Sequence, residues 1–298
     1  MNNDKISSIY YSKNYAADFM KKTYIVFLIL LLCIFDVYLL NIIVSECFYI
    51  PHNIEETELF RNNQISKKAI ERASELSEEN KCDLSDILNP VYLLNDCKIK
   101  NVSMPYKLIK ETKEKYMTAH PEEYKKSLKA MAAIYNDIKY FPVAKSNTSD
   151  NWVAYDNSYG ADRNYNGKYK HEGIDLMAEN NVSGYYPVVS VTDGVVENIG
   201  WLEKGGYRVG VRSDSSGYFY YAHLSSYGNI KQGDKIKAGT LLGYMGDTGY
   251  GKVEGTSGNF DVHLHFGIYI KTEHYDELSI NPYHVLKYLE DYTIIADY

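Results

Sequence analysis

Residues 262–270 read VHLHFGIYI, a run in which apolar side chains alternate with His263 and His265 before it becomes fully apolar. Side chains two positions apart lie on the same face of a β-strand, about 6 to 7 Å apart along the chain. The run therefore predicts a strand that presents both histidines on one face and Leu264 on the other.

Further β-type runs precede this strand and are separated by turns that contain glycine, such as Gly205-Gly206 and Ser216-Gly217. These runs cover residues 188–196, 207–211, 218–222 and 241–245. Short strands at this spacing predict a mainly β domain of antiparallel sheets.

Glycine divides the chain into two differently built halves. All 20 glycines lie at or after Gly160, and residues 1–159 contain none. The polar run 146–151 reads as a linker, so we expect the β domain to cover residues 150–298. A net charge of −7 excludes a strongly basic nucleic-acid-binding protein, and no nucleic-acid partner is expected.

The glycine-free half predicts a small helical domain over residues 45–145, in which apolar residues recur at helical spacing. Ser66 and Asp83 are placed to cap two helices, and Pro121 stands where the first residue of a third belongs. Cys82 and Cys97 flank the second helix. A disulfide between them would stabilise the domain by about 3 kcal/mol, and two free thiols are the alternative.

Residues 24–44, YIVFLILLLCIFDVYLLNIIV, are apolar over roughly 31 Å of helix, which is enough to cross a bilayer. No small-residue cleavage site follows, which favours a retained anchor over a cleaved signal peptide. Lysines precede the span and glutamates follow it, so we expect a single-pass protein of the cell membrane with residues 1–23 in the cytoplasm. Asp36 inside the span either contacts a partner helix in the membrane or is a tolerated, protonated residue.

A second histidine motif lies at the start of the β domain, in HEGID, where His171 and Asp175 are four residues apart. Imidazole and carboxylate are ligands that zinc accepts. Together with one histidine of the HLH pair they would make three protein ligands, which leaves the open fourth position of a catalytic zinc site. Each motif alone is common, and a lone histidine is more often a hydrogen-bonded polar residue than a ligand.

The two motifs occur in order with a third, Ala222-His223-Leu224, between them. In this combination the chain resembles the lysostaphin-type (LytM-like) zinc endopeptidases of bacterial cell walls. The resemblance covers roughly residues 155–289, through the runs RNYNGKYKHEGIDLMA, YPVVSVTDGVVENIGW, YYAHLSSYGNIKQGDKIKAGTLLGYMGDTG, HLHFGIYI and INPYHVL. It implies a fold like the barrel-sandwich hybrid and hydrolysis of a peptide bond in the stem peptide or cross-bridge of peptidoglycan.

The resemblance also implies roles for individual residues. Its zinc ligands fall on His171, Asp175 and His265, and its unligated catalytic histidines on His263 and His223. A tyrosine that stabilises the transition state falls on Tyr165, with Tyr169 as the alternative. By these roles His263 would exchange the proton of the attacking water, while His223 and the tyrosine would hydrogen-bond the oxyanion.

The segment 250–262 is longer than the family pattern and is expected to border the substrate groove. Two functions fit the resemblance. The first is an active, membrane-anchored peptidoglycan hydrolase, and the second is a non-catalytic scaffold or regulator of wall hydrolysis, division or sporulation with the same fold. The complete set of ligands and histidines favours catalysis.

Overall fold

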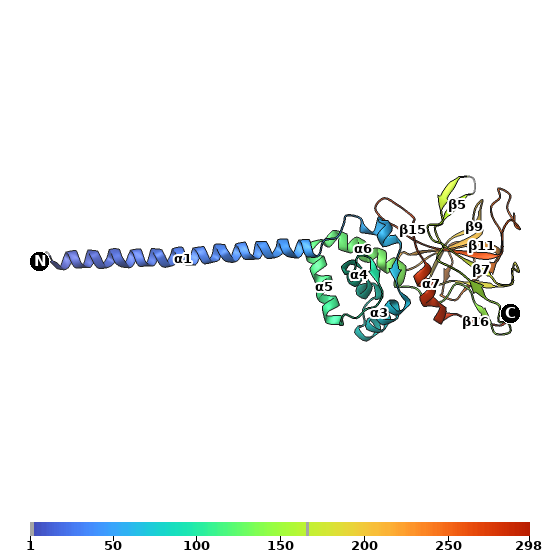
Figure 1. Ribbon diagram of the computed structural model, residues 1–298, viewed down its shortest axis with the longest axis horizontal. Coiled ribbons are helices and arrows are strands. Elements are labelled where there is room, and N and C mark those ends of the chain that lie inside the picture. Colours follow the sequence, from blue (N-terminus) through green and yellow to red (C-terminus); the bar gives the residue numbers. More distant parts are fainter. Residues whose placement is uncertain (1–2, 165–166) are drawn as a thin grey trace. The chain divides into compact units, whose positions relative to one another are not determined.

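The computed structural model describes residues 3–164 and 167–298, which form two compact units, Met1–Tyr49 and Ile50–Tyr298. The first unit is one long helix, α1 (Asn3–Cys47) (Figure 1). Its part Phe19–Cys47 contains an 18-residue window with a mean hydropathy of 2.7 and is long and apolar enough to cross a membrane. The predicted span 24–44 lies within it, but a signal sequence at an N-terminus meets the same description.

The second unit begins with a helical segment whose apolar sides face inward. Its elements are η1 (Ile54–Glu56), α2 (Glu58–Arg61), β1 (Gln64–Ile65), α3 (Lys67–Asn80), α4 (Leu84–Leu94), β2 (Lys98–Ile99), α5 (Tyr106–Ala119) and α6 (Pro121–Tyr135). Ser66 caps α3 by accepting a hydrogen bond from the Ala69 backbone N–H at 3.2 Å. Asp83 stands at the N-cap position of α4 without a side-chain cap bond, and α6 begins at Pro121.

Cys82 and Cys97 are free thiols in the structure, so the disulfide that was one of the two expectations is not formed. The Cys82 side chain instead hydrogen-bonds Tyr106, while Cys97 is buried after α4 in a left-handed backbone conformation with φ +56°. Burial raises the pKa of both thiols, that of Cys97 to about 12. Both groups are therefore protonated at neutral pH, which disfavours oxidation to a bridge.

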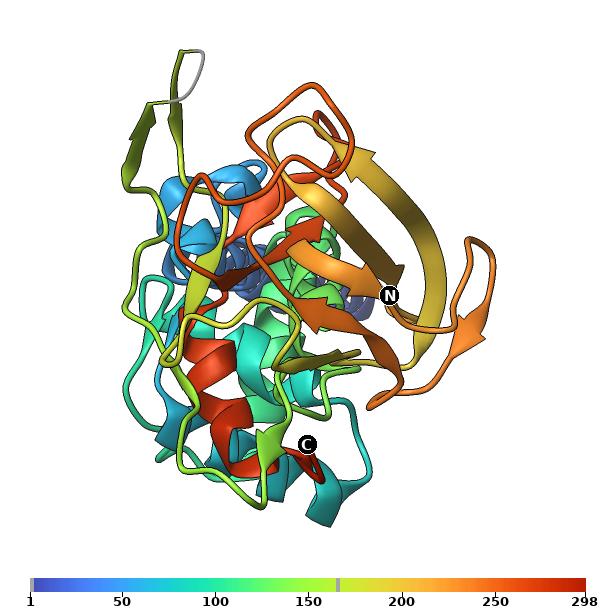
Figure 2. The same cartoon turned by 90° about the vertical axis from the view of Figure 1, so that its right-hand side faces the viewer.

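The β part of the second unit is mainly one ten-stranded sheet whose pairings are all antiparallel, as the strand spacing predicted (Figure 2). The main path through the sheet runs β12-β9-β10-β11-β14-β7-β4, while β13 pairs with β11 and β8, and β15 pairs with β14. Its strands are β4 (Val153–Ala154), β7 (Ile174–Ala178), β8 (Pro187–Val189), β9 (Gly194–Leu202), β10 (Gly206–Arg212), β11 (Tyr218–Tyr227), β12 (Lys235–Ile236), β13 (Leu241–Met245), β14 (His263–Ile270) and β15 (Leu278–Ile280).

Smaller elements complete this part of the molecule. They are the hairpin of β5 (Asp162–Asn164) and β6 (Lys168–Lys170), the parallel pair β3 (Lys145–Ser146) and β16 (Ile295–Ala296), helix α7 (Tyr283–Leu289) and η2 (Glu290–Tyr292). The sheet core is filled by alternate residues of each strand, as in β14, where Leu264, Phe266 and Ile268 are fully buried.

The helical segment packs directly on the β part, and the two belong to one compact unit. Helix α7 contacts α3, and the two lie together in Figure 2. Arg61 at the end of α2 donates to the carbonyl and the hydroxyl oxygen of Ser279 on β15, both at 2.9 Å. Asn63 donates to the carbonyl of Asn281 at 3.1 Å. These bonds tie the helical segment to the strand that follows β14.

Residues 138–146, which precede the polar run 146–151, already lie against the sheet. The Lys139 N–H donates to the Val191 carbonyl at 2.9 Å, and the Ala144 N–H donates to that of Pro187 at 3.1 Å. Phe141 and Val143 are fully buried. The expected domain boundary near residue 150 stays a prediction, and Phe141 and Val143, which precede it, belong to the core of the β part.

We expect a fragment of residues 150–298 to be less stable than one of residues 137–298, and both to be less stable than residues 50–298. Removing Phe141 and Val143 strips two large side chains from the core, a loss of several kcal/mol in the free energy of unfolding. Thermal denaturation of the three fragments measures the order. Equal midpoints for the two shorter fragments would show that residues 137–149 do not support the sheet.

Candidate metal centre and active site

The register of the sheet brings Asp175 and His265 side by side. On β14, His265 pairs with Asp175 of β7 on one side and with Ala222 of β11 on the other. Paired residues of neighbouring antiparallel strands point to the same face, so these three share one surface of the sheet. Asp175 and His265 are 90 residues apart in the sequence, and the pairing of β14 with β7 places them side by side.

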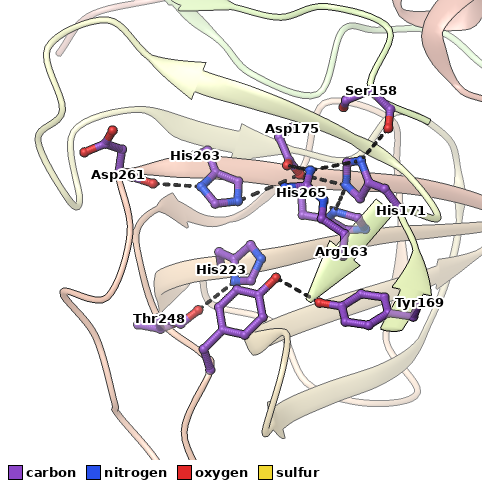
Figure 3. A network of polar contacts seen from close by, with 11 residues as sticks. Ser158, Arg163, Tyr169, His171, Asp175, His223, Thr248, Asp261, His263 and His265 are labelled. Atoms are coloured by element: carbon purple, nitrogen blue, oxygen red, sulfur yellow. Dashed lines mark hydrogen bonds and ion pairs between the residues drawn. The ribbon is translucent and has the colours of Figure 1, made fainter. Parts of the chain in front are cut away.

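His171 joins them from the turn before β7 (Figure 3). Its backbone N–H donates to the Ala161 carbonyl at 2.9 Å. His171 Nε2 lies 2.9 Å from His265 Nδ1 and 3.0 Å from Asp175 Oδ1, and the last two atoms are 3.0 Å apart. Tetrahedral zinc at about 2.0 to 2.1 Å from its ligands requires donor atoms roughly 3.3 to 3.4 Å apart. The three donors thus fit a small divalent cation after a slight expansion, and these residues form the candidate metal cluster of the described chain.

Outer partners orient two of the three groups. His171 Nδ1 lies 3.0 Å from the Ser158 carbonyl and 3.1 Å from Arg163 Nη2; a proton on Nδ1 bonds the carbonyl, which only accepts, and leaves Nε2 free as a ligand. Arg163 donates to Asp175 Oδ2, the oxygen that is not in the triangle. Neither partner was identified from the sequence, because Ser158 acts through its backbone and Arg163 lies on the separate β5 strand.

Opposing effects act on the pKa of Asp175. Burial of the carboxyl raises it, but when the imidazoles are protonated the hydrogen bonds from His171 and His265 and the charges of His265 and His263 outweigh burial. The net result holds the pKa of Asp175 far below its usual range. The carboxyl is therefore ionised at neutral pH, as a metal ligand must be.

Gly173, in the middle of HEGID, leaves the space that His265 occupies. A Cβ atom at this position would lie 2.5 Å from the Phe266 carbonyl oxygen and 2.7 Å from Cε1 and Nε2 of His265. These contacts are shorter than side chains tolerate, and one of them is to backbone. The glycine therefore has a steric function beside the metal cluster, which its place in the motif alone did not reveal.

We expect Gly173→Ala to displace His265 and to weaken zinc binding at least tenfold, because one imidazole is forced out of the triangle. Gly233→Ala is the control, since a Cβ there meets nothing within 4 Å although φ is +90°. Competition with a zinc chelator measures the affinity of both variants. An unchanged affinity in Gly173→Ala would mean that strand β14 moves away without loss of ligand geometry.

His223 reaches the same face through a β-bulge. On β10, Tyr207 pairs with Leu224 and Val209 with Tyr221, so Arg208 alone opposes both Ala222 and His223. His223 has a left-handed backbone with φ +64°, which is rare for a residue other than glycine. Bulges re-aim side chains next to active sites, and here the extra residue brings His223 to the candidate metal centre.

His223 and His263 are held as the same tautomer. His223 Nδ1 lies 2.7 Å from the Thr248 carbonyl and His263 Nδ1 lies 2.7 Å from the Asp261 carbonyl, so each Nδ1 must donate. Each Nε2 is then a hydrogen-bond acceptor, and that of His263 lies 3.8 Å from Asp175 Oδ1. Burial lowers the pKa of both histidines, which keeps them neutral near pH 7.

The tyrosine expected to stabilise the transition state is only partly described. Tyr165 lies outside the described residues. The alternative, Tyr169 on β6, lines the cleft with its hydroxyl 3.3 Å from that of Tyr250, and the Lys204 ammonium lies 3.8 Å from the centre of its ring. The assignment of this role to Tyr165 or Tyr169 stays a prediction.

All the described residues of the predicted site line one cleft of about 600 Å³. The long segment 250–262 borders it as expected, through Tyr250 and Phe260, whose ring centres lie 5.7 and 4.7 Å from that of His223. The other walls are aromatic and charged. They include Lys170, Glu172, Asn198, Leu202, Lys204, Arg208, Tyr218, Tyr220, Tyr269 and Glu277.

The residues that form this site also match known proteins. The model of peptidase family M23 matches residues 169–277, which include the whole histidine and aspartate cluster. A crystal structure from Ruminococcus gnavus, of a protein assigned as the glycyl-glycine endopeptidase LytM, is 38% identical, covers 86% of this chain and 98% of its own, and superimposes with a TM-score of 0.70. The chain belongs to peptidase family M23.

Characterised M23 relatives match the catalytic region. The L-Ala–D-Glu endopeptidase of Bacillus subtilis is 39% identical over 140 residues, which is 47% of this chain and 41% of that protein. The glycyl-glycine endopeptidase ALE-1 of Staphylococcus capitis is 36% identical over 132 residues, which is 41% of this chain and 32% of that protein. The chain thus matches less than half the length of either relative, and M23 is a family of peptidoglycan endopeptidases.

Proposed function

We propose that the chain is a zinc-dependent endopeptidase that hydrolyses peptide bonds in peptidoglycan. The observation that carries the proposal is the triangle of His171 Nε2, Asp175 Oδ1 and His265 Nδ1, with donors 2.9 to 3.0 Å apart and two neutral histidines beside it. Two imidazoles and one carboxylate make a donor set typical of catalytic zinc. A bound zinc ion would supply Lewis-acid polarisation of the scissile carbonyl and lower the pKa of the attacking water.

The chain's own groups would move the proton. His263 Nε2 is an acceptor with its Nδ1 proton held by Asp261, so it can take a proton from water as the oxygen attacks the carbonyl carbon. The same nitrogen then delivers that proton to the leaving amine when the C–N bond breaks. Water is thereby divided between a new carboxylate and a new amino group.

The resemblance to the lysostaphin-type endopeptidases implies that His223 hydrogen-bonds the oxyanion, but its tautomer suits it to the attacking water instead. Because its Nδ1 proton is bound to the Thr248 carbonyl, neutral His223 offers only an acceptor to the cleft. It can hydrogen-bond an attacking water in this state, but it can donate to an oxyanion only after gaining a proton itself. The oxyanion would otherwise depend on the tyrosine, Tyr165 or Tyr169.

Residues 45–145 and 150–298 would lie outside the cell membrane as helical and peptidase domains, held by a single span at residues 24–44. Lys21 and Lys22 before the span and Glu46 after it support a cytoplasmic N-terminus. Asp36 would either contact a partner helix within the membrane or be tolerated there without one. The chain is acidic, with a net charge of −7, so its charge would not attract it to an anionic wall. The membrane tether would keep it close to the wall instead.

Digestion of purified peptidoglycan by the zinc-loaded full chain in detergent tests the function. We expect new amino groups, and mass spectrometry of the released muropeptides identifies the bond that is cut. About one bound zinc per chain without cleavage of any wall type would instead support the scaffold or regulator with the same fold.

A further inference from the structure

We propose that Arg208 binds a carboxylate of the substrate, so that the cleft selects a peptide with a free carboxylate near the scissile bond over a neutral glycine peptide. This inference deepens the proposed function and rests on it. It starts from the position of Arg208 in the sheet.

Arg208 lies in the same row across the sheet as the candidate metal ligands. Asp175 pairs with His265, His265 pairs with Ala222, and Ala222 belongs to the bulge that opposes Arg208. Neighbouring strands lie 4.7 to 4.9 Å apart, and β11 alone lies between β10 and β14, so two strand spacings separate the backbones of Arg208 and His265 by roughly 10 Å. The Arg208 side chain can span part of this distance, so a group that it binds would lie within about two residues of the reacting carbonyl along a substrate.

Small residues flank Arg208 in that row. Its partner on β9 is Gly200, and its two neighbours in the β11 bulge are Ala222 and His223, so His223 is the one large side chain next to it on these strands. Arg208 and Ala222 both line the cleft. The floor between the metal cluster and the guanidinium is therefore low enough for an extended peptide to lie across it.

Arg208 also differs from the other cations of the cleft in its partners. Arg163 pairs with Asp175, Lys170 pairs with Asp162 at 2.9 Å, and Lys204 lies over the Tyr169 ring. Within residues 3–164 and 167–298, Arg208 has no ion pair, and its Nη1 is buried without a hydrogen-bond partner. Leaving a buried charged donor unsatisfied is costly, which points to a partner that arrives with the substrate.

Arg212, on the same face of β10, shows how this sheet satisfies an arginine that has a structural role. Its Nε and Nη2 donate to the two oxygens of Glu197 at 2.6 and 2.8 Å. A carboxylate is the geometric complement of a guanidinium in this two-bond arrangement. The comparison indicates what kind of group Arg208 lacks.

Aromatic rings wall this part of the cleft. A Cβ at Gly210 would lie 1.9 Å from the Tyr218 hydroxyl, and one at Gly267 would lie 2.7 Å from a ring carbon of Tyr269. These two glycines therefore let the rings of Tyr218 and Tyr269 lie across the sheet in the cleft that Arg208 also lines. Apolar walls lower the local dielectric and strengthen a charged hydrogen bond. Because Glu172 and Glu277 line the same cleft, the placement of Arg208, not a net positive charge, would make the selection.

Two matched stem peptides test the proposal with the zinc-loaded full chain in detergent. Both carry Ala–γ-Glu–Lys, with the glutamate α-carboxyl free in one and amidated in the other, and pentaglycine serves as a neutral third probe. We expect kcat/KM to be at least about 30-fold higher for the free acid than for the amide. Arg208→Gln should abolish this preference by lowering only the acid's value, and Arg208→Lys should retain part of it.

Arg72→Gln, which removes the same charge from exposed helix α3, is the control and should leave the preference unchanged. Zinc content and thermal midpoint verify that each variant is folded. Equal loss on both peptides in Arg208→Gln, equal rates in the wild type, or cleavage of pentaglycine alone would overturn the proposal.

If the wild type cleaves no probe, the proposed function fails at these bonds, and calorimetric binding of the same two peptides then decides the inference separately. Tighter binding of the acid that Arg208→Gln abolishes would support the role of Arg208 in a protein that binds wall peptides. Equal binding of acid and amide, or no binding of either, would overturn it.

Discussion

Replacing His265 with alanine is expected to remove bound zinc and peptidoglycan hydrolysis together. His265 Nδ1 is one corner of the donor triangle, 2.9 Å from His171 Nε2 and 3.0 Å from Asp175 Oδ1. Only two protein donors would remain, whereas catalytic zinc sites hold the ion with three. Metal analysis should therefore fall from about one zinc per chain to near zero, and amino-group release should fall to the level of chelator-treated wild type.

His52→Ala is the matched control for this variant, because its side chain is 72% exposed and lies outside the cleft. It should keep both zinc and activity. Wild type stripped by a chelator should recover when zinc is returned, while His265→Ala should not. A His265→Ala chain that still holds one zinc per molecule would contradict the ligand assignment.

Much of the candidate site could be predicted from sequence because each motif is local. The spacing in HEGID and HLH fixes which side chains share a face or a turn, and the order of the motifs supports the family, which the comparisons confirm. What spacing cannot give is the register between distant strands. The pairing of His265 with Asp175 follows from hydrogen bonds between β14 and β7.

The bulge at His223 and the role of Arg208 lie beyond sequence reasoning for the same reason. A histidine at φ +64° has no local signature, and the bulge exists only relative to the partner strand β10. The alternation of side chains along a strand places Arg208 on one face, but it does not show whether an acidic side chain lies close enough to pair with it. The sequence also left open whether Cys82 and Cys97 are paired, and in the structure both are free thiols, with Cys97 buried and Cys82 partly exposed.

The same strand that carries His265 also carries His263, and we expect the two to behave differently when replaced. His263 donates through Nδ1 to the Asp261 carbonyl, and its Nε2 lies 3.8 Å from Asp175 Oδ1, outside the tight triangle. Its removal should leave all three donors in place. We therefore expect His263→Ala to keep about one zinc and to lose about 10²- to 10⁴-fold in kcat, the usual contribution of a general base.

This separation of metal content from activity is the discriminating result, because His263 and His265 are two residues apart on one face of one strand. A variant that merely disturbed β14 would lower zinc content and thermal stability as well as kcat. His263→Gln should likewise keep the metal, and it fills more of the buried site than alanine while lacking a titratable nitrogen. Loss of zinc from both His263 variants would mean that the metal uses His263 as a ligand, and that the base must be sought at His223, whose ring centre lies 4.7 Å away.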